Sequence, residues 1–284
     1  MNVLSNPEEY YKLQREVKDI SNRQAFSNCY LTAEVLAHYI SQESVRYFLL
    51  QEGVAFLINR GTVYTFQFCL APSSRIALPP MEKPLVADLV YRAGDISPAQ
   101  QVAERQLIQA GFNLQRESHE YAIGTISESE RKKEEALCRK LEKANYRFQP
   151  VEIERAGEAY WLLKEGIDPF NMHGFQSMNW EGLCANRQAF CVISPQNHIC
   201  AVYVLPTGFR GGLSVVCEKY RGLGLGKAIC FYSWYVAGHF SANEHIWTGS
   251  DNDVLRHIAV VMGGSDTKRR AKQYVKINHC PQFV

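Results

Sequence analysis

The stretch from Arg221 to Lys227 reads Arg-Gly-Leu-Gly-Leu-Gly-Lys and combines closely spaced glycines with a positive charge at each end. Glycine adopts backbone angles that other residues avoid and lets a ligand approach the peptide N–H groups. The run Leu213 to Cys217, apolar as in a buried strand, precedes the glycines. A stripe at helical spacing follows them, formed by Ile229, Tyr232, Val236 and Phe240. Because the start of a helix attracts anions, this order predicts a turn that binds phosphate or pyrophosphate.

Three phosphate-binding motifs compete for this stretch, and spacing excludes two of them. A Walker A loop needs a glycine where Arg221 stands and a hydroxyl residue where Ala228 stands. A dinucleotide fingerprint needs its third glycine at the position of Lys227. The pattern that fits is R-x-x-G-x-G, from Arg221 to Gly226. A glycine-rich turn without any ligand is the structural alternative.

On this pattern, and on the preceding Glu218-Lys219-Tyr220, the chain resembles the GNAT superfamily of N-acetyltransferases. In that family the loop follows the fourth strand and holds the pyrophosphate of coenzyme A. The resemblance implies an α/β fold with a mixed sheet, acetyl-CoA as co-substrate and no metal. It also implies contacts from the fourth strand to the pantetheine arm, and from an asparagine at the start of the last long helix. The expected cofactor-binding residues are Val215, Val216, Cys217, Arg221, Gly222, Leu223, Gly224, Leu225, Gly226, Lys227 and Asn252.

Acyl transfer to an amine needs a base for the amine proton and help for the departing thiolate. The candidate bases are Glu218 and Asp251, which follow the fourth and fifth expected strands, and His173 on the acceptor side. Each of them also fits a solvated loop position. The tyrosine that usually protonates the thiolate in the family would stand at Ala259, and His257 points about 160° away from that position on a helix. The source of the proton is therefore open.

The composition limits the classes of protein. The 284 residues are 46% hydrophobic and 21% charged with a net charge of +2, which is typical of a globular protein and gives no basic field for nucleic acid. The nine cysteines form no C-x-x-C pair, which favours a reduced setting, and Cys217 and Cys230 are expected to be structural thiols. No secretory signal or membrane-spanning run is visible. We therefore expect a cytoplasmic protein that does not enter a membrane.

The element pattern predicts two units joined by a charged helix. Residues 1–126 are expected to form an α+β domain, 127–145 the helix and 146–284 the acetyl-CoA-binding domain. The segment Leu85 to Gly94 echoes Gly212 to Gly222, and Ala110-Gly111 echoes Met262-Gly263. These echoes suggest that the first half is a degenerate copy that has lost a helix, a strand and the phosphate loop, so that one coenzyme A binds per chain. An unrelated α+β domain is the alternative.

The functional hypothesis is an N-acetyltransferase that moves an acetyl group from acetyl-CoA to a primary amine, in a small molecule or a peptide, by direct attack. Transfer of a longer acyl chain is an alternative within the same chemistry. A non-catalytic acyl-CoA-binding or sensor protein is the alternative from another class, and Ala259 in place of the usual tyrosine favours it. The sequence specifies neither the acceptor nor the oligomeric state.

Overall fold

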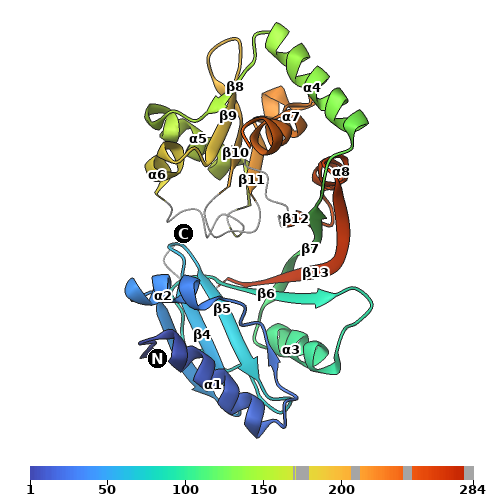
Figure 1. Cartoon of the computed structure of the whole chain (residues 1–284). Helices are drawn as coiled ribbons and strands as arrows, with labels where there is room; N and C mark the ends of the chain where they lie inside the picture. Colours follow the sequence, from blue (N-terminus) through green and yellow to red (C-terminus); the bar gives the residue numbers. More distant parts are fainter. Residues whose placement is uncertain (169, 171–178, 206–211, 239–244, 278–284) are drawn as a thin grey trace. The chain divides into compact units, whose positions relative to one another are not determined.

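The computed structural model describes residues 1–168, 170, 179–205, 212–238 and 245–277. The chain divides into two compact units, one made of residues 1–119 with the chain from 268 onward, the other of residues 120–267 (Figure 1). These divisions differ from the expected ones at 126 and 146. Helix α4 (Glu128–Lys143) belongs to the second unit, whereas strand β13 (Gly264–Lys276) ends in the first. The reason for the second difference is that β13 pairs with β6 (Leu85–Arg92) from Arg269 onward.

The first unit is a mixed sheet with helices on it. Its strands lie in the order β1-β3-β4-β5-β6-β13, and the β5–β6 pair is parallel. Side chains alternate along each strand, so that one face of the sheet packs against α3 and the other against α1 and α2. The elements are β1 (Asn2–Val3), α1 (Pro7–Ile20), β2 (Phe26–Ser27), α2 (Ala33–Ser41), β3 (Val45–Leu50), β4 (Gly53–Asn59), β5 (Tyr64–Leu70), β6, α3 (Pro98–Gln109) and the start of β7 (Asn113–Ile123).

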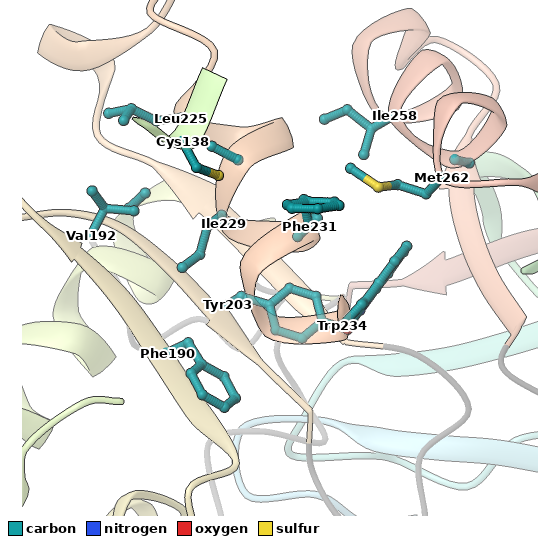
Figure 2. Packing of buried hydrophobic residues seen from close by; sticks show 14 of the residues in the cluster. Cys138, Phe190, Val192, Tyr203, Leu225, Ile229, Phe231, Trp234, Ile258 and Met262 are labelled. Atoms are coloured by element: carbon teal, nitrogen blue, oxygen red, sulfur yellow. Dashed lines mark hydrogen bonds between the residues drawn. The ribbon is translucent and has the colours of Figure 1, made fainter. Parts of the chain in front are cut away.

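The second unit contains an antiparallel sheet in the order β11-β10-β9-β8, and β12 is the neighbour of β7. Figure 2 shows α7 between the sheet residues Phe190, Val192 and Tyr203 on one side and, on the other, Ile258 of α8 and Met262 directly after it. The elements after α4 are β8 (Arg147–Pro150), α5 (Ala156–Gly166), α6 (Trp180–Ala185), β9 (Ala189–Ile193), β10 (Ile199–Val204), β11 (Leu213–Val216), α7 (Leu225–Phe231), a π-helix (Tyr232–Val236), β12 (His245–Gly249), α8 (Asp253–Val261) and β13. The predicted mixed α/β class is confirmed.

Side-chain caps mark the starts of three helices. The side chains of Asn6, Thr32 and Ser127 each accept a hydrogen bond from the backbone N–H three residues later. Such a bond satisfies one of the donors that a helix leaves unpaired at its first turn. Local sequence therefore determines where these helices begin.

The helix after the glycine loop differs from its prediction. It changes after Phe231 into a π-helix, in which the Ala237 N–H bonds to the carbonyl of Tyr232, five residues back. This wider turn rotates the chain, so that Trp234 is buried and Val236 is 58% exposed. The predicted inward position of Val236 is therefore wrong, and Phe240 lies outside the described residues.

The element order changes which strands of the two halves correspond in the hypothesis of an internal repeat. In the second unit β9, β10 and β11 are followed by α7, β12, α8 and β13, and in the first unit β3, β4 and β5 are followed by β6, α3 and β7. Strand β6 thus corresponds to β12, and the counterpart of the phosphate loop is the connection after Leu70 rather than Arg92 to Asp95. The segment 71–84 contains no helix and no glycine. Under the hypothesis of an internal repeat, the first half lacks a counterpart of α7 but has a counterpart of every strand from β9 to β13.

We predict that Glu104→Gln weakens the attachment of β13 to α3. Glu104 Oε1 lies 2.7 Å from Lys272 Nζ and also accepts a hydrogen bond from Tyr274. Burial opposes ionisation of Glu104, but the hydrogen bonds from Lys272 and Tyr274 outweigh it and lower the pKa of this carboxyl. The expected loss is about 1 kcal/mol of unfolding free energy at pH 7, measured by urea denaturation.

This loss should depend on pH. A carboxyl whose pKa is lowered by folding stabilises the protein above its unfolded pKa, and this contribution disappears as the pH falls through the folded pKa. The difference between wild type and Glu104→Gln should therefore shrink below about pH 4. Glu117→Gln is the control, because Glu117 is 4.0 Å from Lys272 and 43% exposed. Equal losses at pH 3 and pH 7 would contradict the assignment.

Candidate functional site

Strand β11 exposes one edge to a ligand. It pairs with β10 on one side, with Val215 opposite Val202 and Val216 opposite Ala201, and no described strand pairs with its other edge. The N–H of Cys217 donates to the carbonyl of Cys200. Because hydrogen-bonded and non-bonded pairs alternate along antiparallel strands, the N–H and C=O of Val216 point away from β10. The backbone of Val216 therefore faces the open edge, and the N–H of Cys217, which we expected to be available, is used within the sheet.

The glycine turn presents a run of backbone donors directly after this edge. Within the described part of the chain, none of the six N–H groups from Gly222 to Lys227 has a hydrogen-bond acceptor. Gly224 precedes α7 with φ +82, and Gly222 has φ +84, angles that non-glycine residues rarely adopt. Six neighbouring donors at the start of a helix provide the environment that phosphate oxygens require.

Close packing favours glycine at Gly224, whereas a Cβ atom at Gly226 would make an ordinary contact. A Cβ atom on Gly226 would lie 3.4 Å from Val216 Cγ2, and one on Gly224 would lie 3.2 Å from Leu137 of α4. A Cβ atom on Gly222 would meet nothing within 4 Å. Gly222 therefore lies on the open side of the turn, together with the exposed Arg221 and Leu223.

The positive charge of the turn is smaller than the sequence predicted. Arg221 is exposed, and its Nε donates to the carbonyl of Val216 at 3.4 Å. Lys227 instead pairs with Glu134 of α4, at 2.8 Å between Nζ and Oε1. The Glu134 side chain is only 1% exposed, so its charge needs this partner. Lys227 consequently neutralises an internal carboxylate, and its predicted contact with the cofactor stays a prediction.

The candidate acid–base residues lie at the same end of β11 and β12 as the glycine turn. Glu218 and Asp251 are both exposed and follow the ends of these strands, which does not favour either as a base next to an acyl group held along β11. Asn252 caps α8 by accepting a hydrogen bond from the Leu255 N–H, the structural alternative to a cofactor contact. Ala259 is fully buried. His173 lies outside the described residues.

Two buried cysteines of the second unit are not activated. Burial raises the pKa of Cys230 to about 12 and the pKa of Cys200 to about 12, so both stay protonated at neutral pH. Cys217 and Cys230 were expected to be buried structural thiols, and Cys230 is buried whereas Cys217 is partly exposed. A covalent acyl-cysteine at Cys230 is therefore disfavoured.

Sequence reasoning missed two polar features of the second unit. One is the ion pair of Glu134 with Lys227, since the sequence predicts only that Glu134 lies on a charged helix. The other is the contact of Glu120 in β7 with His245 in β12. Neither pair lies within one element, so no local spacing could have revealed them.

The first unit lacks an open edge at the corresponding strand, β5. Strands β5 and β6 pair at Tyr64 with Leu85 and at Thr65 with Val86, and beyond these pairs β2 takes the place of β6. Asn28, next to β2, donates through Nδ2 to the carbonyls of Phe66 and Asp88, both at 3.2 Å, and accepts from the Phe68 N–H at 2.7 Å. Its carboxamide thus bridges the two strands as a peptide group would. The chain itself covers this edge.

Two negative findings concern metal binding and membrane insertion. Among the described residues, no cluster of three or more His, Cys, Asp and Glu side chains could hold a metal ion. None of the described helices is long and apolar enough to cross a bilayer.

Comparisons with known proteins show similarity at the level of structure alone. No protein-family model and no curated protein matches the sequence. A Drosophila protein of known structure matches with a TM-score of 0.50 at 11% identity, covering 94% of this chain and 88% of that one. An acetyltransferase of the GNAT family from Colwellia psychrerythraea matches with a TM-score of 0.49 at 12% identity, covering 96% and 98%. A tandem GNAT protein from the clavulanic acid biosynthesis pathway matches with a TM-score of 0.46 at 11% identity, covering 82% and 83%.

We predict that Lys227→Met destabilises the protein through Glu134. The substitution leaves a buried carboxylate without its partner, and we expect a loss of about 2 kcal/mol in unfolding free energy. The double variant Lys227→Met, Glu134→Gln should recover most of this loss, because the buried charge is then removed as well. Chemical denaturation of the two single variants and the double variant measures the coupling. If the losses of the two single variants add up in the double variant, Lys227 and Glu134 do not stabilise each other.

Proposed function

We propose that this protein transfers an acyl group, in the simplest case acetyl, from acetyl-CoA to a primary amine of a small molecule or peptide. The observation that carries the proposal is the edge of β11 followed directly by six amides, none of which has a partner among the described residues. Coenzyme A joins an extended arm that contains amide groups to a pyrophosphate. An open edge and an anion-binding turn, in this order, complement both parts of that molecule.

The binding roles follow from the register. The amides of Gly222 to Lys227 surround the pyrophosphate, and the exposed Arg221 adds a positive charge at its rim. The pantetheine arm lies along β11, where the N–H and C=O of Val216 offer one donor and one acceptor. Val215 contributes by packing: its side chain is buried among apolar residues of α5 and the sheet and fixes the strand. The acyl end then lies toward Leu213.

The chemistry is a direct attack of the amine nitrogen on the thioester carbon. A backbone N–H at the open edge stabilises negative charge on the carbonyl oxygen as it develops. Outward N–H groups alternate along β11, so toward Leu213 the next one after Val216 is that of Ser214, which supplies this bond. No side chain at Ala259 can protonate the leaving sulfur. A thiol has an ordinary pKa of about 8.5, so coenzyme A leaves as a thiolate and takes its proton from water.

A matched pair of variants at Gly222 tests the phosphate assignment. Asn and Asp both tolerate positive φ and have nearly the same size, and the position is open. Gly222→Asp places a negative charge among the amides, whereas Gly222→Asn does not. We expect the Asp variant to bind coenzyme A at least tenfold more weakly than the Asn variant by isothermal titration calorimetry. Equal affinities would contradict phosphate binding at this turn.

The same titration gives the number of sites. Because β2 and Asn28 cover the corresponding edge of the first unit, we expect one equivalent of coenzyme A per chain. Two equivalents would mean that the first unit opens to a ligand. One equivalent that persists unchanged in Gly222→Asp would place the site in the first unit.

A non-catalytic acyl-CoA-binding protein is the second candidate, and the buried Ala259 favours it. Release of free thiol from acetyl-CoA in the presence of a panel of amines separates the two. An enzyme releases thiol at a rate that depends on the amine, whereas a sensor binds acetyl-CoA and releases none. Replacing acetyl-CoA by longer acyl-CoA esters in the same assay tests the acyl chain length.

A further inference from the structure

A carboxylate and an imidazole meet in the second unit, away from the glycine turn. His245 is the first residue of β12, and its Nδ1 lies 3.5 Å from Oε1 of Glu120 in β7. Thr267 of β13 donates from Oγ1 to the other oxygen of Glu120 at 2.8 Å. The Glu120 side chain is 2% exposed, so it is held in one position by three adjacent strands. Of the described residues, Glu120 is the charged group that contacts His245.

The two nitrogens of His245 have different surroundings. Nδ1 is shielded from solvent on the side of Glu120, although the side chain as a whole is 26% exposed. The exposed part of the side chain therefore lies on its other atoms. A carboxylate next to Nδ1 favours the tautomer with the proton on that atom, and this leaves the lone pair on Nε2. In that tautomer Nε2 is the basic nitrogen.

The path of the chain places His245 at the acyl end of β11. Gly226, at the start of α7, packs on Val216 at the end of β11. Trp234, further along the helix, donates a hydrogen bond to the hydroxyl of Tyr203. That hydroxyl lies next to Gly212, which directly precedes β11. The helix therefore runs back along the strand. In a strand–helix–strand unit the second strand begins at the end where the first began.

The far end of β12 supports this direction. The chain after Gly249 enters α8, whose Ile258 lies near Gly226 and hence near the glycine turn. Strand β12 thus ends near the turn, and His245 begins it at the opposite end. Glu218 and Asp251 follow the strands at the turn end. The contact of His245 with Glu120 therefore lies at the end of β12 away from the glycine turn, where the proposed complex places the acyl group.

We propose that Nε2 of His245 is the base that takes the proton from the acceptor amine, and that Glu120 and Thr267 are positioning residues that hold its ring. This inference rests on the proposed acyl transfer. The amine nitrogen forms a bond to the thioester carbon, the C–S bond breaks, and its electron pair leaves on sulfur. The proton from the attacking nitrogen passes to Nε2, and the imidazolium returns it to water. Glu120 lies beside the ring and keeps its orientation while the proton is held on Nε2.

Kinetics of four variants test the assignment. His245→Gln should lower kcat about a hundredfold with little change in the affinity for coenzyme A, because the residue lies away from the glycine turn. Glu120→Gln should lower kcat about tenfold, since the carboxylate that positions the ring is gone. Thr267→Val should give a smaller loss in the same direction. His257→Gln, at an exposed histidine of α8, is the matched control and should behave as wild type.

Two measurements distinguish a base from a structural histidine. Free imidazole should restore part of the activity of His245→Ala, which a purely structural role would not allow. Nitrogen-15 NMR of the ring, recorded without cofactor, should show the proton on Nδ1 in wild type and a mixture of tautomers in Glu120→Gln. A wild-type rate and pH profile in His245→Gln would overturn the proposal while leaving acyl transfer intact. Coenzyme A binding without thiol release in the wild type would overturn the proposed function and the base together.

Discussion

The site depends on one unsatisfied edge of a β-sheet. A strand edge carries N–H and C=O groups that must find partners, and proteins usually cover such edges. In the first unit the chain covers the edge of β5 itself, with β2 and the carboxamide of Asn28. In the second unit no described segment covers the edge of β11. In the proposed function a ligand with amide groups in an extended arm supplies the missing partners. This difference at the edge separates the two units more clearly than any difference in their element order.

The electrostatics of the turn come mainly from the backbone. The sequence places a cation on each side of the glycines, but the buried Glu134 neutralises Lys227 and leaves Arg221 as the exposed charge. The unpaired amides of Gly222 to Lys227 remain, and they are directional donors that require a ligand of matching shape. A site of this kind discriminates by geometry as well as by charge. Such a site suits a pyrophosphate whose attached pantetheine arm is bound as well, and it suits a free anion less.

Helix α4 contributes to the turn although it precedes the strands of its unit in sequence. Leu137 packs against Gly224, Glu134 pairs with Lys227, and Cys138 and Leu141 belong to the same hydrophobic core as α7 (Figure 2). The prediction that this segment is a charged helix joining two units is therefore incomplete. Its charged residues are mostly exposed, but one of them stabilises the conformation of the phosphate turn.

The sequence by itself determined the features that depend on neighbours along the chain. Side-chain caps specified the starts of α1, α2 and α4, and glycine spacing with flanking strand and helix patterns specified the turn from Arg221 to Gly226. The tertiary structure alone decided which groups these elements bring together. It paired Lys227 with Glu134, directed the N–H of Val216 to the open edge, rotated Trp234 into the core through a π-helix, and placed Glu120 beside His245. Caps and turns follow from local backbone geometry, whereas strand register and packing between distant elements depend on contacts that no local spacing encodes.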